Sequence, residues 1–294
     1  MSALTMSLAS RASRRKRLRI PLLLKIAFAW VALLAIVALF ANELAPFDYM
    51  AIDLRNRLAP PLGFGGSADH ILGTDELGRD MASRLIYSIR MSIVIAFGAT
   101  MIGAFFGTIL GCLAAHFRGV IEAVILTLAD FQAAMPFLIL ALSVLAFVGN
   151  SLTIFILLLG LHGWERYTRI ARGLAIAATG QGYAGAVRQL GAHPVRVYTH
   201  HILPNIASTL IVSMTIAFPE IMLVESGLSF LGLGVQPPAT SLGSMIGYGR
   251  DYLARAPWIL MAPALVISLT ALAVSIIGDG LRDHLDRSTG SHAS

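Results

Sequence analysis

The chain has 294 residues, of which 56% are hydrophobic and only 13% are charged, and its mean hydropathy is +0.76. An ordinary soluble domain carries about twice that share of charge, so this class is excluded and the long apolar runs are assigned to lipid. The net charge of +6 does not indicate nucleic acid, because the basic residues are spread over segments that flank apolar runs. Cys112 is the single cysteine, which excludes an internal disulfide and a cysteine-based zinc cluster.

Six apolar runs follow one another along the chain. A basic tail occupies residues 1–25, and the run Ile26–Ala45 is long enough to cross a hydrocarbon core of about 30 Å. A twin-arginine signal peptide is the alternative for this beginning. The mixed segment 46–87 is expected to face water. Further runs cover 89–115, 120–148, 152–171, 206–231 and 257–278, so the sequence predicts an all-α integral membrane protein with six transmembrane helices.

The distribution of lysine and arginine predicts the orientation of the chain. Most of the 22 basic residues fall in the N-terminal tail, in the segment around 166–196 and in the tail 281–294. Basic residues are enriched in cytoplasmic loops, which predicts a cytoplasmic N-terminus and places the loop 172–205 and the C-terminal tail on the same side. Segment 46–87 then lies outside the cytoplasm, and residues 88–280 form the membrane core.

The cytoplasmic loop 172–205 contains a first short helix with one apolar face. Tyr183, Ala186, Val187 and Leu190 have the spacing of residues on one side of a helix. Gly191 follows, at a position where glycine readily adopts the left-handed conformation that ends a helix. The remaining surface of this helix is polar and basic.

A second short helix is predicted directly after that glycine. Pro194 suits the first turn of a helix, where its missing N–H has no partner to lose. Val195, Tyr198 and Ile202 form its apolar stripe, and Pro204 is expected to end it. Such a helix pair fits either the surface of an anionic membrane or a groove in a cytoplasmic protein, and the pattern alone favours neither.

Acidic residues inside apolar runs are costly unless they are paired or hydrated, and three of them are singled out here. Asp130 lies in the run 120–148, and Glu220 and Glu225 lie in the run 206–231, next to Pro219, which is expected to kink the helix. They are interpreted either as carboxylates on a translocation path or as structural partners of basic groups. Glu220 is the preferred candidate for contact with a substrate.

The outer stretch HILGTDELGRD combines His70 with several acids. Its spacing does not fit a calcium-binding EF-hand loop. The preferred interpretation is a capped surface helix, with Thr74 or Asp75 as the cap and with Arg79 and Arg84 paired to acids.

Several longer motifs resemble a known family. The stretch GYAGAVRQLGAHPVRVYTHHILPN resembles the EAA loop of bacterial ABC importer permeases, with Ala186, Gly191, Ile202, Leu203 and Pro204 at matching positions. The stretches 71–93, 225–238, 249–258 and 278–286 resemble the permease subunit of the dipeptide, oligopeptide and nickel branch. The similarity covers about residues 45–287. Gly185 replaces the glutamate for which the loop is named, and Val187 replaces its second alanine.

This resemblance implies a type I ABC importer permease fold, with residues 88–280 as the core permease domain in the inner membrane of a bacterium. It also implies a second permease subunit, two cytoplasmic ATPase subunits that bind ATP and magnesium, and an extracytoplasmic binding protein. No cofactor, metal or nucleic acid is expected on this chain itself. The residues that the resemblance assigns to ATPase coupling are Tyr183, Gly185, Ala186, Val187, Leu190, Gly191, Pro194, Ile202, Leu203 and Pro204.

The chain is not expected to hydrolyse ATP. Its only lysines, Lys16 and Lys25, do not belong to a phosphate-binding loop, so the energy for active transport must come from another polypeptide. An intramembrane protease and a passive channel are the competing functions, and the sequence contains no H-E-x-x-H or G-x-S-x-G motif. Dipeptides or short oligopeptides are the expected substrate, with nickel or a metal chelate as the alternative.

Overall fold

The computed structural model describes residues 21–180 and 193–290. Within these ranges the regular structure is helical, apart from one isolated bridge between Thr74 and Asp80. The helices and helical turns are α1 (Leu22–Leu39), α2 (Ala41–Leu44), η1 (Leu54–Asn56), α3 (Met81–Phe117), α4 (Gly119–Ala134), α5 (Phe137–Val148), α6 (Leu152–Gly160), α7 (Trp164–Gly180), α9 (Pro194–Val197), η2 (Tyr198–Ile202), α10 (Leu203–Phe230), α11 (Leu242–Gly249), η3 (Arg250–Tyr252) and α12 (Trp258–Gly290).

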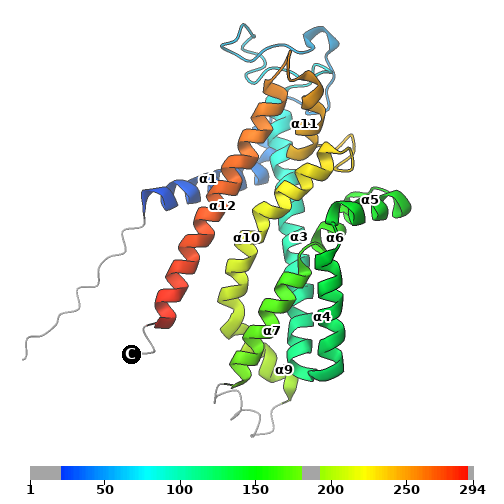
Figure 1. Cartoon of the computed structure of the whole chain (residues 1–294). Helices are drawn as coiled ribbons and strands as arrows, with labels where there is room; N and C mark the ends of the chain where they lie inside the picture. The colour runs from blue at the N-terminus through cyan, green and yellow to red at the C-terminus, as the bar shows by residue number, and fades with distance from the viewer. Residues whose placement is uncertain (1–20, 181–192, 291–294) are drawn as a thin grey trace, which may run out of the picture.

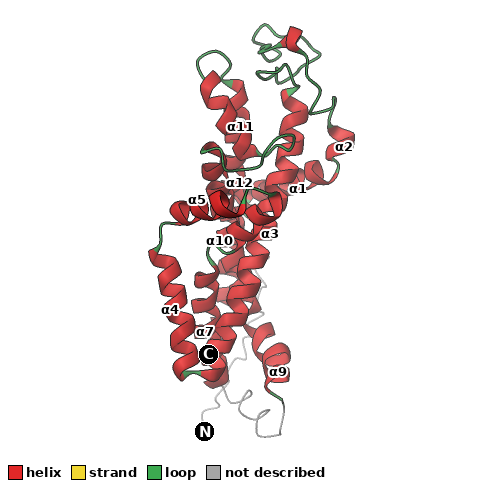
Figure 2. Cartoon of the chain, turned by 90° about the vertical axis from the view of Figure 1, so that its right-hand side faces the viewer, coloured by secondary structure: helices red, strands yellow, loops and turns green. Residues whose placement is uncertain are grey.

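The long helices form an elongated bundle, across which α1 and α5 lie (Figure 1). The segment between α2 and α3 and the short helix α11 lie at one end of the bundle, whereas α9 lies at the other end. A view turned by 90° shows the same separation (Figure 2). The described part of the loop predicted to face the cytoplasm and the segment predicted to face the outside therefore lie at opposite ends of the bundle.

Four described helical segments are long and apolar enough to cross a membrane: Leu22–Leu39, Met81–Phe117, Pro194–Phe230 and Trp258–Asp283. A fifth span is possible only if α4 and α5 count as one, and these two helices meet at an angle of 94°. The predicted span over 120–148 is therefore not one continuous helix. Met135 is extended because the ring of Pro136 disfavours a helical residue before it, and this ends α4.

The predicted span 152–171 is also not one helix. Helix α6 ends at Gly160, and α7 begins at Trp164 after a turn in which Gly163 has a φ of +92°. Helix α7 then continues to Gly180, into the segment predicted as loop 172–205. Its polar face is tied to α4 by ion pairs of Arg169 with Asp130 and of Arg172 with Glu122. These contacts explain why a segment of low hydrophobicity remains helical inside the bundle.

Helices α3 and α7 pack closely through a row of glycines. Gly103, Gly107 and Gly111 are four residues apart and therefore lie on one face of α3. A Cβ atom on Gly107 would lie 2.4 Å from the carbonyl oxygen of Trp164, and one on Gly111 would lie 2.5 Å from that of Thr168. Small residues allow this approach, which in a membrane is a main source of helix–helix attraction.

The helix that begins at Pro194 does not end at Pro204, contrary to the prediction. Helix α9 passes through the π-helical turn η2 into α10, and the helix continues through Pro219 to Phe230 without a break in the assigned helix. In η2 the N–H of Leu203 bonds to the carbonyl of Tyr198, five residues earlier. This wide turn accommodates Pro204, which has no N–H to donate and whose ring would collide with an ordinary preceding turn.

The same turn changes which side chains are buried. Val195, predicted on the apolar stripe, is 61% exposed, whereas Val197, Ile202, Ile206 and Leu210 are buried in one cluster with the alanines of α7. The spacing from Val197 to Ile202 is five, because η2 contains one residue more than an α-helical turn. The predicted apolar stripe assumed ordinary helical spacing and therefore began at the exposed Val195 instead of the buried Val197.

Candidate functional site

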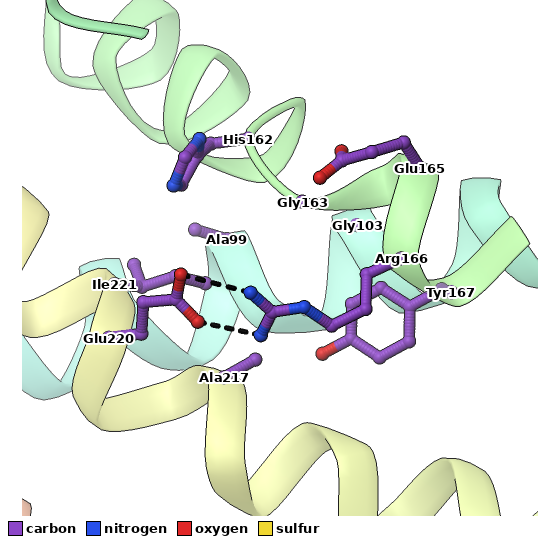
Figure 3. A pocket seen from close by; sticks show the side chains of 10 residues that line it. All are labelled: Ala99, Gly103, His162, Gly163, Glu165, Arg166, Tyr167, Ala217, Glu220 and Ile221. Atoms are coloured by element: carbon purple, nitrogen blue, oxygen red, sulfur yellow. Dashed lines mark hydrogen bonds and ion pairs between the residues drawn. The ribbon is translucent and has the colours of Figure 1, made fainter. Parts of the chain in front are cut away.

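A pocket lies where α6 gives way to α7, against α3 and α10 (Figure 3). It encloses about 370 Å³ of empty space, part of it open to the surroundings. The break in the helix at Gly163 exposes this space, because a continuous helix would fill it with side chains. The residues that line it are Ala99, Gly103, His162, Gly163, Glu165, Arg166, Tyr167, Ala217, Glu220 and Ile221.

An ion pair between two helices crosses the pocket. Arg166 of α7 donates two hydrogen bonds to Glu220 of α10, Nη1 to Oε2 at 2.7 Å and Nη2 to Oε1 at 3.1 Å (Figure 3). This two-point geometry fixes the orientation of both groups and is stronger than a single contact. The sequence analysis singled out Glu220 and missed Arg166. The available signal was a basic residue inside the apolar run 152–171, since a charge inside a span requires a partner.

Two further polar groups in the pocket lack partners in the described part of the chain. The Oε2 atom of Glu165 and the hydroxyl of Tyr167 are both buried without a hydrogen bond. Tyr167 is only 2% exposed, and Figure 3 shows its ring beside Arg166, with the hydroxyl directed toward Ala217. Glu165 carried the same signal as Arg166, because it is a charged residue inside the apolar run 152–171, whereas Tyr167 carried none.

The other two acids predicted on a translocation path are not part of this pocket. Asp130 pairs with Arg169 at 2.8 Å, and its side chain is 72% exposed. Glu225 is 1% exposed and accepts hydrogen bonds from Ser229 at 2.8 Å and Ser241 at 2.7 Å, which ties α10 to the residue before α11. The structure thus gives each of these acids a protein partner and brings only Glu220 to the pocket.

Four of the predicted coupling residues lie in the described part of the chain. Pro194 is the first residue of α9, where His193 caps the helix by accepting from the N–H of Val195 at 3.4 Å. Ile202 is fully buried. Leu203 packs against the same cluster, and Pro204 is exposed. The predicted coupling residues outside the described ranges are Tyr183, Gly185, Ala186, Val187, Leu190 and Gly191.

The outer stretch is held by ion pairs, as predicted, but its helix begins later. Asp75 is fully buried and binds both Arg79 and Arg84. The cap of α3 is Asp80, which accepts from the N–H of Ser83 at 2.7 Å, so the prediction of Thr74 or Asp75 as the cap is wrong. Asp75 cannot serve as the cap because its Oδ1 atom already accepts the N–H groups of residues 77 and 79 within the preceding turn.

The long apolar helices, with paired charges held between them, define an α-helical protein of the membrane. Comparison with known proteins identifies the family. The chain belongs to the family described as binding-protein-dependent transport system inner membrane components, whose profile matches residues 107–291. This membership makes the chain a membrane-embedded permease component of a transport system. The family assigned from the resemblance of sequence motifs is confirmed.

Relatives with substantial identity span most of the chain. The di/tripeptide transport system permease protein DppC of Pseudomonas aeruginosa is 38% identical over 87% of this chain and 85% of its own length. The dipeptide transport system permease protein DppC of Haemophilus influenzae is 34% identical over 89% of each chain. The oligopeptide transport system permease protein OppC of Bacillus subtilis is 34% identical over 87% of this chain and 82% of its own.

Solved structures share the fold. A chain of the MetNI methionine ABC transporter in an inward-facing conformation superposes with a TM-score of 0.57, at 20% identity, over 69% of this chain and 97% of that chain. A chain from a crystal structure of an amino acid ABC transporter with histidines gives a TM-score of 0.52, at 15% identity, over 69% of this chain and 94% of that chain. The all-helical ABC importer permease fold is therefore confirmed.

Proposed function

We propose that this chain is a transmembrane permease subunit of an ATP-driven importer of dipeptides or short oligopeptides, and that it forms half of the translocation path. The observation that carries the proposal is the identity of 34–38% with permeases named for di/tripeptide, dipeptide and oligopeptide transport, over more than four fifths of the chain. These names favour peptides over the alternative of nickel or a metal chelate.

The subunit works with partners that supply energy and substrate. The family description itself names a dependence on a binding protein, which delivers the cargo from outside the cytoplasm. Two cytoplasmic ABC subunits bind ATP and magnesium and hydrolyse the nucleotide, and a second permease subunit supplies the other half of the path. Neither lysine of the chain belongs to a phosphate-binding loop, so the proposal assigns ATP hydrolysis to the partner subunits.

Residues 183–204 couple this subunit to the ATPases. The arrangement of α9 supports this role, because α9 continues through η2 into α10, the helix that carries Glu220. A displacement applied near Pro194 is thereby passed to the wall of the pocket without an intervening loop. To drive a two-state permease almost completely from one state to the other, the ATPases must favour one state by about 5.5 kcal/mol.

Copurification and uptake test the proposal together. The full chain, expressed with its neighbouring transport subunits, is expected to copurify with two ATPase chains and to support ATP-dependent uptake of a labelled dipeptide into proteoliposomes. Leu190→Arg and Gly191→Arg are expected to abolish uptake and ATPase association while leaving membrane insertion intact. Uptake that survives both substitutions would contradict the coupling role, and uptake without ATP would contradict the importer itself.

A further inference from the structure

The pocket between α6, α7 and α10 has two carboxylates and one guanidinium. Arg166 satisfies both oxygens of Glu220. Glu165 makes no hydrogen bond or ion pair within the described part of the chain, although its Oε2 atom is buried. His162, the other ionisable group on this wall, stacks on Phe137 with ring centroids 4.1 Å apart. The pocket therefore holds one more carboxylate than guanidinium.

The position of the pocket along α10 argues against contact with lipid. Glu220 lies inside the membrane-spanning helical segment Pro194–Phe230, ten residues or about 15 Å before its end at Phe230. At this depth the side chains of Arg166 and Glu220 are 42% and 41% exposed in the isolated chain. Exposed charges inside a membrane-spanning segment face a water-filled path or another protein chain, because contact with lipid is too costly. This face of α7 and α10 is therefore turned toward the path or toward the second permease subunit that completes it.

The hydroxyl of Tyr167 adds a hydrogen-bonding group that is independent of the charges. Tyr167 is almost fully buried, and its hydroxyl lines the same pocket without a partner in the described ranges. A buried polar group without a partner is costly, so it indicates a ligand or water in the working protein. The hydroxyl oxygen and the free oxygen of Glu165 are both acceptors, which suits a ligand with several N–H donors.

We infer that this pocket is a binding site on the translocation path for the free α-ammonium group of a peptide. Glu165 and Glu220 supply the negative charge that attracts the ammonium group, and the hydroxyl of Tyr167 is a further hydrogen-bond acceptor on the pocket wall. Arg166 holds the carboxylate of Glu220 in position when the site is empty, and releases one of its two hydrogen bonds when cargo arrives. The inference rests on the proposed function, because it takes the cargo to be a peptide.

Uptake by the complete transporter in proteoliposomes tests whether this site binds the ammonium group. ATP-dependent initial rates are measured for dialanine and for N-acetyl-dialanine, which lacks the ammonium group. The variants are wild type, Glu165→Gln, Glu220→Gln and the control Glu122→Gln, which removes an ion pair between α4 and α7 away from the pocket. The ratio of the two rates is compared among variants, because any preference of the binding protein is common to all of them.

The ratio of free to acetylated peptide is expected to fall by about tenfold in Glu165→Gln and Glu220→Gln, equivalent to about 1.4 kcal/mol, and to stay at the wild-type value in Glu122→Gln. A ratio that is the same in all four proteins, even at reduced rates, overturns the inference and leaves Glu165 as a carboxylate that merely stabilises the first turn of α7. Wild-type protein that takes up neither peptide contradicts the proposed function instead.

A second measurement covers the case in which the binding protein rejects the acetylated peptide. His162→Cys in a Cys112→Ser background places a single thiol on the pocket wall, and its reaction with a maleimide is followed in the detergent-solubilised complex without binding protein. Dialanine is expected to slow the reaction and N-acetyl-dialanine is not, and Glu165→Gln is expected to remove this protection. Equal protection by both peptides, or by neither, overturns the inference.

Discussion

Replacing Gly107 with valine tests the packing of α3 on α7. A Cβ atom at this position would lie 2.4 Å from the carbonyl oxygen of Trp164 and 2.6 Å from the Cβ atom of Tyr167. Ordinary contacts begin at 3.4 Å, so the two helices would have to separate by about 1 Å, before the two further methyl groups of valine are accommodated. Tyr167 lines the pocket, so the separation would also reach the site.

The expected loss is about 2–3 kcal/mol, at the upper end of the range of about 1–3 kcal/mol for overpacking a well-packed core. Helix propensity does not explain such a loss, because valine is slightly better than glycine in a helix, by a few tenths of a kcal/mol. Gly173→Val is the matched control. Gly173 lies on the exposed side of α7, and a Cβ atom there meets nothing within 4 Å.

Thermal unfolding of the purified transporter in detergent, followed by size-exclusion chromatography after heating, measures both variants. The midpoint of Gly107→Val is expected to fall by several degrees, since about 1 kcal/mol corresponds to about 2–4 °C for a chain of this size class. Gly173→Val is expected to unfold at the wild-type temperature. Equal midpoints for Gly107→Val and wild type would refute the close packing of α3 and α7.

Two further substitutions probe buried polar groups, with the same thermal assay. Asp75→Ala leaves the guanidinium of Arg84 buried without its partner and is expected to cost about 3–5 kcal/mol, whereas Asp251→Ala breaks an exposed pair and should cost less than about 1 kcal/mol. Similar losses for both would mean that Arg84 finds another partner. Glu225→Ala leaves two serine hydroxyls without an acceptor and is expected to cost at least about 1–3 kcal/mol, whereas Glu225→Gln keeps an acceptor oxygen and should cost less. If glutamine proves as harmful as alanine, hydrogen bonding is not what Glu225 contributes.

Much of the bundle was predictable, because hydrophobic length is a strong signal in a membrane protein. The helices α3, α10 and α12 fall on predicted apolar runs, and Pro194 begins a helix as expected. The bend between α4 and α5 was not predicted. Hydropathy averaged over a run of residues is insensitive to direction, and Pro136 is equally compatible with a kinked span and with a sharp turn.

The site was only half predictable for a different reason. Glu220 was conspicuous as an acid in an apolar run, but Arg166 lies 54 positions away along the chain. Their pairing depends on the turn at Gly163 and on the packing of α7 against α10, which no local pattern encodes. The sequence analysis preferred Glu220 over Asp130 and Glu225, and the structure separates them further, because Asp130 pairs with Arg169 and Glu225 accepts from two serines outside the pocket.

The π-helical turn between α9 and α10 also determines how the chain tolerates changes in length. Because η2 already contains one surplus residue, a single deletion within 198–202 would convert it to an ordinary α-helical turn and leave Glu220 opposite Arg166. The helix between this turn and Glu220 contains no surplus residue. A single deletion there would rotate Glu220 by about 100° around the helix axis, away from the pocket. This turn can thus absorb the loss of one residue that any other part of the helix before Glu220 would transmit to the site.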